Sequence, residues 1–495
     1  MTFASIGSDA DSRRWCALAV IVAAQFMVIL DVAIVNVALP SIKSDLHFSQ
    51  ESLQWVITAY AILFGGVLLL GGRLADLLGR RRLFIAGVVL FTGSSLLSGL
   101  AWSERSLIAF RALQGVGGAL LAPAALSILM TTFQEGRERN IALGIWGAAS
   151  GSGGAAGVLL GGLLTSYLHW SWIFFINVPV GTAVIALTPW LLRESRVDRA
   201  RRHFDLAGAA SVTAGLMLLV YAMTRATQHG WASAATIALL AGSALLLVAF
   251  VAIELRSRSP LLPMRIFRLR TLAAANATAV IVAAVGFSMF FLLTLYLQQV
   301  LRYSAIQTGV AFIAITLTIV LFSNVAQTLV TRLGARRVLT VGLLFASAAL
   351  ALLTRLPVHG HYFRDVLPAL LLGGVGMALS FVPMTIAGLT GVERADAGVA
   401  SGLINTSRQI GGAIGLAAVS TIAATSTSHY AQSQPATAVP SANALTHGFQ
   451  VAFYVLTSLA IVGALVAAIF IEPRPRSTEI ESFNAEAIEP VKEAA

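Results

Sequence analysis

Long apolar stretches separated by short polar loops run through the whole chain. Each stretch reaches the roughly 20 mostly apolar residues that a helix needs to cross a hydrocarbon core about 30 Å thick. Because lipid cannot satisfy the open edges of a β-sheet, such stretches must be helices. About fourteen membrane-spanning helices are predicted by this length rule, at residues 16–38, 52–72, 83–102, 106–130, 140–164, 172–192, 206–224, 234–254, 272–295, 306–330, 338–354, 367–390, 398–423 and 449–471. The predicted fold class is therefore an all-α polytopic membrane protein.

The basic residues gather in alternate loops, and this asymmetry predicts how the chain is oriented. When the N-terminus is assigned to the cytoplasm, the loops on that side hold most of the 33 Arg and Lys residues, in agreement with the positive-inside rule. An even number of spans then puts both termini in the cytoplasm. Lys43 and Lys492 are the only lysines, which is typical of a GC-rich bacterial genome. The expected location is the cytoplasmic (inner) membrane of a bacterium, which the chain crosses many times.

The composition supports this class and excludes others. Hydrophobic residues make up 57% of the chain and charged residues only 11%, which is a more apolar balance than that of soluble domains. The net charge of +11 is explained by the basic loops and by contact with anionic head groups of membrane lipids. No nucleic-acid partner is therefore expected. Cys16 is the only cysteine, which excludes an internal disulfide.

An internal repeat predicts how the spans are grouped. Residues 78–87 (LGRRRLFIAG) are similar to residues 333–342 (LGARRVLTVG), and a glycine-rich fifth span corresponds to a glycine-rich thirteenth. Both pairs are eight spans apart, which predicts two six-helix bundles with two helices inserted between them. Internal repeats with a site at their interface are typical of secondary transporters. The expected domains are an N-terminal bundle at 1–192, a linker with the inserted helices at 193–254, a C-terminal bundle at 255–471 and a cytoplasmic tail at 472–495.

Two connecting segments have compositions of their own. Residues 255–271 mix apolar side chains with arginines, which predicts a short amphipathic helix in the membrane interface, although a plain loop fits nearly as well. Residues 424–448 contain no Asp, Glu, Lys or Arg and are rich in Ser, Thr and Ala. Such a composition predicts a flexible outer loop.

A basic loop after the second span carries a candidate gate. Residues 72–82 (GRLADLLGRRR) resemble the G-x-L-a-D-r-x-G-r-k signature of the major facilitator superfamily. The resemblance implies a gating role for Gly72, Asp76, Gly79, Arg80 and Arg81. A glycine permits a tight turn between two helices, and a carboxylate can pair with an arginine or with the N-terminus of a nearby helix. These contacts would hold the cytoplasmic side shut. Leu77 stands where the signature has arginine, so one charge of the network is missing.

Three further motifs resemble one branch of that superfamily, the fourteen-span drug:proton antiporters. They are residues 30–40 (LDVAIVNVALP), residues 107–119 with Arg111, Gln114, Gly115 and Gly117, and residues 169–181 (HWSWIFFINVPVG). Ala33 and Ser171 stand where the branch usually has Thr and Arg. The resemblance covers nearly the whole chain. It implies the major facilitator fold, alternating access, and export of drugs driven by a proton gradient without a cofactor.

The fifth span contains a glycine pattern close to the antiporter motif G-x8-G-x3-G-P-x2-G-G of the same branch. The matching positions are Gly144, Gly153, Gly157, Gly161 and Gly162. Small residues let helices approach closely in lipid, so either packing alone or a specific gating role explains them. Val158 occupies the proline position, which removes an expected helix bend and leaves the antiport assignment of this motif open.

Charged side chains inside a bilayer are costly and rare, so each one is a functional hypothesis. Asp31 is the only acidic residue well inside an expected span, and Arg111 and Arg408 are the basic ones. Asp31 and Arg111 lie about 12 Å and about 8 Å from the outer ends of their spans, which is close enough in depth for contact. Gln114 shares the helix face of Arg111 and is able to add a hydrogen bond. Arg408 is expected to bind an anionic substrate group or a backbone carbonyl, and a structural role is slightly favoured because no residue marks its partner.

These charges suggest how export is coupled to protons. The hypothesis is that Asp31 alternates between a proton and a cationic substrate, while the charge of Arg111 adjusts how readily the proton is held. The alternative is a static buried ion pair that only fixes helix packing. Candidate substrate contacts are Asp31, Trp55, Tyr60, Gln114 and Asn324. With one membrane carboxylate available, monocationic or neutral amphipathic compounds are expected to be preferred over dications.

Several functions remain open from the sequence. The leading interpretation is a proton-driven exporter of small amphipathic drugs or toxic compounds, and the sequence does not separate it from a dedicated exporter of one antibiotic, siderophore or lipid-like metabolite. The chain lacks the Walker motif of ATP-driven pumps and any metal-spaced cluster of His, Asp or Glu, so neither an enzyme nor a metal site is expected. A membrane receptor without transport is a weaker alternative, because no sizeable soluble domain is present. A monomer is expected.

Overall fold

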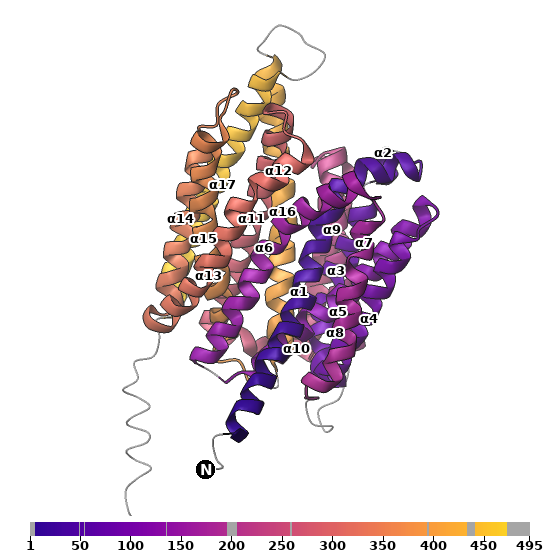
Figure 1. The fold of residues 1–495 in the computed structure, drawn as a ribbon, viewed down its shortest axis with the longest axis vertical. Coiled ribbons are helices and arrows are strands. Elements are labelled where there is room, and N and C mark those ends of the chain that lie inside the picture. The colour runs from indigo at the N-terminus through magenta and orange to yellow at the C-terminus, as the bar shows by residue number, and fades with distance from the viewer. Residues whose placement is uncertain are drawn as a thin grey trace, which may run out of the picture.

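The computed structural model describes residues 5–48, 50–53, 55–134, 136–195, 205–257, 260–393, 396–432 and 441–472. All regular structure in this described part is helical, and no β-strand occurs in it (Figure 1). Thirteen of the described helices are long and apolar enough to cross a membrane, and α6, counted as one bent span, makes fourteen. The expectation of an all-α polytopic membrane protein is therefore confirmed.

The first six spans form one bundle of helices. Its elements are α1 Ser5–Asp45, α2 Gln50–Leu53, α3 Trp55–Leu78, α4 Arg80–Gly99, α5 Glu104–Thr132, α6 Arg137–Tyr167, α7 Trp172–Phe175 and α8 Asn177–Leu191. Helix α5 packs on both α3 and α4, and α1 packs along α6. A side chain at Gly117 of α5 would collide with the backbone of Phe91 on α4. Small residues thus let the helices approach closely. Inside lipid no hydrophobic effect drives helices together, so their association depends on such close packing.

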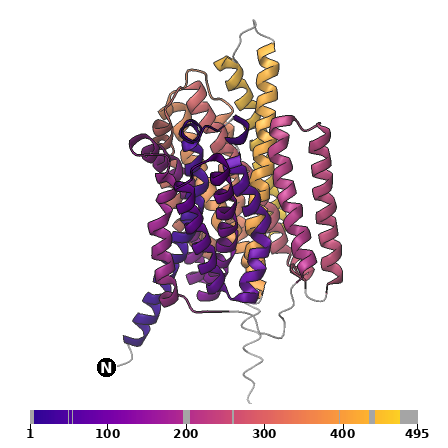
Figure 2. The same cartoon turned by 90° about the vertical axis from the view of Figure 1, so that its right-hand side faces the viewer.

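Two inserted helices lie at the side of the molecule, as Figure 2 shows for α9 Leu206–His229 and α10 Ala234–Arg256. They pack on each other, and α9 also packs on α3 and on α16 Ala397–Gln432. The carboxylate of Asp205 caps α9 by accepting a hydrogen bond from the backbone N–H of Gly208 at 2.7 Å. Few side chains of α10 are buried, so most of its surface is left for contact with lipid.

The connection into the second bundle differs from the expected amphipathic α-helix. Residues Met264–Arg268 form only a five-residue 3-10 helix, η2. The backbone N–H groups of Leu261 and Leu262 both donate to the carboxylate of Glu254 at 3.1 Å. Leu261, Leu262 and Ile266 are buried. These three side chains therefore pack against the protein, whereas Phe267 and Leu269 are exposed.

The last six spans form a second bundle beside the first (Figure 1). Its elements are α11 Arg270–Leu295, η3 Tyr296–Val300, α12 Ala305–Ala311, α13 Ile313–Leu333, α14 Ala335–Leu353, η4 Tyr362–Val366, α15 Leu367–Leu389, α16 Ala397–Gln432 and α17 Ala442–Phe470. Helix α14 packs on α15 and α17, and α11 packs on α16. Large side chains such as Tyr296, Phe312 and Phe453 fill the core between them.

The expectation of a flexible outer loop at 424–448 is wrong for most of its length. Helix α16 continues to Gln432 and α17 begins at Ala442, while residues 433–440 lie outside the described part. The rings of Tyr430 and His447 stack with their centroids 4.7 Å apart. Because alanine favours helix and the two helices have each other to pack on, this uncharged sequence stays helical.

The two bundles meet where α3 and α5 pack on α16, and where α6 packs on α13 and α15. We call the end of the molecule that carries the turn between α3 and α4 the basic end, because three consecutive arginines follow this turn. Near it, Gly72 of α3 and Gly398 of α16 are in backbone contact, and a side chain at either position would overlap the other helix. The hydroxyl oxygen of Ser401 lies 3.1 Å from the carbonyl of Pro123 on α5 and within hydrogen-bonding distance of two carbonyls of its own helix. The bundles are therefore closed against each other on this side.

Candidate functional site

A carboxylate lies fully enclosed in the first bundle. Asp31 of α1 has no exposed surface, and both of its oxygens accept hydrogen bonds. Arg111 of α5 donates from Nη1 to Oδ2 at 2.6 Å. Gln114 of the same helix and Asn177 of α8 donate to Oδ1 at 2.9 Å and 3.0 Å. The structure thus brings three residues singled out in the sequence, Asp31, Arg111 and Gln114, into one network.

The guanidinium of Arg111 is also fully enclosed and has several partners besides Asp31. Its Nη1 donates to Oε1 of Gln114 at 2.7 Å, and its Nε donates to the carbonyl of Val56 at 3.1 Å. The cation lies 4.4 Å from the ring centroid of Tyr60, a distance suited to a cation–π interaction. A buried ion pair offsets its desolvation cost only when the remaining polar atoms are satisfied. In this network the Nε and Nη1 atoms of Arg111 both have acceptors, so much of the desolvation cost is offset.

Two residues of the network were not identified from the sequence, Asn177 and Ser95. The side chain of Asn177 donates to Oγ of Ser95 at 3.0 Å, and Ser95 on α4 donates to the carbonyl of Phe174 at 2.9 Å. Both side chains are buried. Asn177 lies inside the motif at residues 169–181, so an apolar stretch interrupted by one amide was the signal available. A serine in a helix carries no comparable signal, because its hydroxyl commonly bonds to its own helix.

The arrangement couples the charge of Asp31 to the geometry of four helices, α1, α4, α5 and α8. Removing one charge of a buried pair costs about 3–5 kcal/mol, because the other charge is left without compensation. A proton that binds Asp31 would therefore force Arg111 to find new partners or water. Such a rearrangement would move the helices that carry these side chains.

Among the other candidates for substrate contact, Tyr60 lies beside this network, and Trp55 and Asn324 lie apart from it. Tyr60 is buried beneath Arg111, with its hydroxyl unpartnered. Trp55 is 39% exposed and its ring stacks on Tyr221 of the inserted helix α9, with centroids 5.8 Å apart. Asn324 of α13 is exposed. Their roles in substrate binding stay predictions, and for Trp55 the observed partner is the inserted helix pair.

The candidate gate is a clamp that joins the two bundles at the basic end. Asp76 of α3 is fully buried, and Arg80 donates to its Oδ1 from Nη2 at 2.7 Å. The backbone N–H groups of Gly398 and Val399, at the start of α16, donate to the two oxygens of Asp76 at 3.2 Å. A carboxylate at a helix N-terminus satisfies unpaired N–H groups and interacts favourably with the helix dipole. Asp76 therefore binds a helix of the opposite bundle.

Glu194 supports the same turn and was not identified from the sequence. Its carboxylate accepts hydrogen bonds from the backbone N–H groups of Arg81 and Arg82 at 3.1 Å and 3.2 Å, which caps α4. Gly79 has a φ of 110°, and a Cβ there would lie 2.7 Å from an oxygen of Glu194. Only glycine adopts this conformation and leaves this space without strain. The side chain of Arg81 donates to the carbonyl of Leu192 at 3.3 Å and does not reach Asp76.

The glycines of α6 face two different neighbours. Three of them face α1, and a Cβ would lie within 3 Å of atoms of that helix at Gly153, Gly157 and Gly161. The other two face the second bundle, where Gly144 packs on Gln327 of α13 and Gly162 packs on Ile306 of α12. The pattern therefore serves close packing both within a bundle and between bundles.

Substituting Gly157 with alanine is expected to destabilise the protein by about 1–3 kcal/mol, because the new methyl group overpacks the α1–α6 contact. The added Cβ would meet Ala33 at 2.7 Å and the carbonyl of Leu30 at 2.8 Å. Gly154→Ala is the matched control, since no atom lies within 4 Å of its Cβ position. Thermal unfolding of the purified variants in detergent measures both. Equal effects of the two substitutions would contradict the assigned packing.

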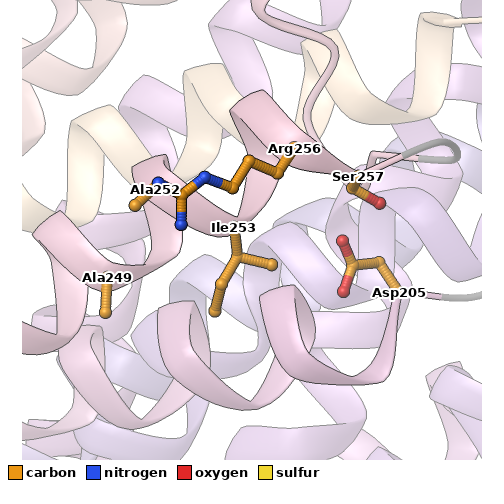
Figure 3. Close-up of a pocket in the computed structure, with 6 residues that line it drawn as sticks. All are labelled: Asp205, Ala249, Ala252, Ile253, Arg256 and Ser257. Carbon is orange, nitrogen blue, oxygen red and sulfur yellow. The ribbon is translucent and has the colours of Figure 1, made fainter.

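The surface also has a hollow of about 470 Å³ on the inserted helices, lined by Asp205, Ala249, Ala252, Ile253, Arg256 and Ser257 (Figure 3). Figure 3 shows the guanidinium of Arg256 and the carboxylate of Asp205 pointing to different parts of it. It lies at the ends of α9 and α10, outside both bundles. None of the residues of the Asp31 network or of the Asp76 clamp lines it.

Two helical bundles with a buried ion pair at membrane depth and a clamp between the bundles define a membrane transporter. The comparisons agree, because the sequence model of the Major Facilitator Superfamily matches residues 21–416. The chain therefore belongs to the Major Facilitator Superfamily. It is a multi-pass membrane protein and a transporter of small molecules rather than an enzyme.

Three curated relatives are similar over most of their lengths. The chain is 40% identical to the puromycin resistance protein pur8 of Streptomyces alboniger, covering 95% of this chain and 93% of the relative. It is 40% identical to the cephamycin export protein CmcT of Amycolatopsis lactamdurans, covering 84% and 86%. It is 36% identical to the multidrug resistance protein Stp of Mycobacterium tuberculosis, covering 81% and 74%.

A solved structure supports the fold. The crystal structure of the human organic anion transporter MFSD10 (TETRAN) matches with a TM-score of 0.63, covering 92% of this chain and 99% of that one. The two sequences are only 15% identical, so this likeness concerns the fold alone.

Proposed function

We propose that the protein exports small amphipathic drugs or antibiotics across the cytoplasmic membrane of a bacterium in exchange for protons. The relatives named for puromycin resistance, cephamycin export and multidrug resistance support export. The buried Asp31–Arg111 pair carries the proposal of proton coupling, because it is enclosed and lies away from the ends of its membrane helices. Both termini are proposed to lie in the cytoplasm, which makes the basic end the cytoplasmic end.

In this proposal, a proton from outside binds Asp31 and releases Arg111 from the ion pair. The donors Gln114 and Asn177 then lose a charged acceptor and keep a neutral one, so the network weakens. Helices α1, α4, α5 and α8 shift as the network rearranges, and the bundles reopen toward the cytoplasm. Release of the proton on that side restores the ion pair. The transporter then works by alternating access with the proton gradient as its energy source and without a cofactor.

The clamp at Asp76 is proposed to hold the cytoplasmic side closed during the outward-facing part of this cycle. Its hydrogen bonds to Gly398 and Val399 connect α3 to α16, so they must break before the bundles can separate there. Gly72 permits the close backbone contact beside it. A clamp of a few hydrogen bonds is weak enough to open within a transport cycle, since each contributes about 0.5–1.5 kcal/mol and those to charged groups more.

The proposed substrates include neutral and monocationic compounds, and the protein is proposed to act as a monomer surrounded by membrane lipids. In the described state, Arg111, Gln114 and Asn177 occupy the oxygens of Asp31. A cationic substrate would therefore reach Asp31 only after the network has opened. Preference for a monocation over a dication follows from the single carboxylate available there.

A second candidate is the dedicated export of one metabolite. It is favoured by the 40% identity to a protein named for the export of a single antibiotic class, cephamycin. Growth inhibition by a panel of unrelated antibiotics distinguishes the two candidates. Protection against one compound alone would favour the dedicated exporter, and protection against several would favour multidrug export.

The proposed proton coupling is tested by efflux of a preloaded monocationic dye, rhodamine 123, from cells producing the protein. Efflux is expected to exceed that of cells with an empty vector and to stop when a protonophore collapses the gradient. Cells with the vector alone, treated in parallel, correct for leakage. Efflux that continues unchanged after the gradient has collapsed would contradict proton coupling.

A further inference from the structure

Arg408 is a buried cation to which the protein itself offers no anion. Its side chain is only 8% exposed, and its guanidinium lies 4.8 Å from the ring centroid of Phe381 on α15. Among the described residues it forms no ion pair and no hydrogen bond, although it lies in the middle of a long membrane helix. The backbone carbonyl that the sequence suggested as one possible partner is not found there. Its nitrogens nevertheless keep some contact with open space.

The contrast with Arg111 shows how unusual this environment is. Arg111 is also buried, and it has a carboxylate, an amide oxygen and a backbone carbonyl as partners. A charge at membrane depth that lacks such partners is expensive, and the ring of Phe381 compensates only in part. A residue that served packing alone would gain nothing from this charge. The cost therefore points to a partner that arrives from outside the protein.

Arg408 lies on the surface along which the two bundles meet. It follows Ser401 by seven residues, so the two side chains share one face of α16. Ser401 on that face bonds to Pro123 of α5, in the first bundle. Arg408 is eleven residues from the start of α16, or about 16 Å at 1.5 Å per residue, which is about half of a 30 Å hydrocarbon core. The cation therefore lies near the middle of the surface that must open during transport.

We propose that Arg408 binds the anionic group of transported substrates, so that amphipathic organic acids belong to the substrate class of this protein. The carboxylate would form a charge-assisted pair with the guanidinium, and an aromatic or apolar part of the substrate would pack near Phe381. This proposal rests on the proposed export function, whose site it specifies. It adds an anion-binding position in the second bundle to the proton-binding position in the first.

Two dyes that differ by one carboxylate provide the test. Rhodamine 110 has a free carboxyl group, and rhodamine 123 is its methyl ester. Binding of each to the purified protein in detergent, followed by fluorescence anisotropy, requires no proton gradient. The wild type is expected to bind the acid more tightly than the ester. Arg408→Gln is expected to weaken binding of the acid by about tenfold or more, as loss of a charged hydrogen bond predicts, and binding of the ester by less than about twofold.

Arg408→Lys is the second variant, because it keeps the positive charge without the planar fork of donors. It is expected to recover part of the affinity for the acid, and it keeps the test decisive if the glutamine variant does not fold. The proposal is overturned if the wild type binds neither dye or both equally, or if both variants lose the two dyes to the same extent. Since no gradient is used, failure of proton coupling would leave this result unaffected.

Discussion

Asp31→Asn is expected to abolish proton-driven export while the protein still reaches the membrane. The asparagine keeps the size of the side chain but holds no exchangeable charge, and it leaves the buried guanidinium of Arg111 without its carboxylate. Breaking a buried pair in this way costs about 3–5 kcal/mol, of which the amide oxygen recovers a part by accepting a hydrogen bond. Efflux of rhodamine 123 and thermal unfolding in detergent measure the two consequences. Export by this variant that still stops with a protonophore would exclude the coupling role.

The double variant Asp31→Asn with Arg111→Gln separates coupling from packing. It removes both charges, so the uncompensated cation is gone and the free energy of unfolding is expected to recover by a large part of the loss. If Asp31 carries the proton, the double variant remains unable to export. Recovery of export together with stability would instead support the alternative that the pair is static and only fixes the packing of α1 on α5.

Asp76→Asn is expected to open the cytoplasmic side and to reduce export strongly. The substitution weakens the clamp to the N–H groups of Gly398 and Val399 and removes the carboxylate charge with which Arg80, only 4% exposed, forms its ion pair. Each hydrogen bond to a charged group contributes about 1.5–3 kcal/mol. Losing this stabilisation of the closed clamp is a large change for a protein that must alternate between two conformations. The outward-facing state is destabilised most, because the clamp exists only while this side is closed.

Accessibility of one engineered thiol measures this opening directly. Ser401→Cys in a Cys16→Ser background puts the thiol in the closed contact between α16 and α5. A membrane-impermeant maleimide added to inside-out vesicles is expected to react slowly in the otherwise unchanged protein and faster when Asp76→Asn is added. Arg82→Gln is the control, because its exposed pair with Glu194 contributes only about 0–1 kcal/mol. Equal labelling in all three proteins would contradict the clamp.

The Asp31 network and the Asp76 clamp also differ in whether they connect one bundle or two. The Asp31 network lies within the first bundle, where its hydrogen bonds join residues up to 146 positions apart. The Asp76 clamp joins residues 322 positions apart and connects the two bundles. The Asp31 network and the Asp76 clamp are therefore separate sites, and the shared helix α5 carries both Arg111 and the carbonyl of Pro123 that Ser401 contacts.

Asp31 and Arg111 could be found from the sequence because a charged side chain has a high cost in lipid. A span must be long and apolar, and a charge within it is rare enough to be noticed. Asp31 and Arg111 were identified for this reason, and their similar depth indicated that they meet. Asn177 and Ser95 were missed because a neutral amide or hydroxyl costs much less in a helix and has no charge to pair.

The partners of Asp76 could not be predicted from the sequence for a different reason. Gly398 and Val399 contribute only backbone N–H groups, which every residue except proline has, so no side chain marks them. The same limit applies to residues 424–448. Their composition suggested a loop, and only the mutual packing of α16 and α17 decided that most of them are helical.

By itself, the sequence determined that the chain crosses a membrane about fourteen times, because backbone groups in lipid have to be satisfied within each helix. It also singled out which charges are candidates for a function, since lipid makes every unnecessary charge costly. The tertiary structure alone decided which atoms satisfy those charges. It enclosed Asp31 among donors from two helices, attached Asp76 to a helix of the other bundle, and left Arg408 without an anionic or hydrogen-bonding partner in the described part of the chain. These differences depend on distances between residues far apart in the chain, and no local pattern encodes them.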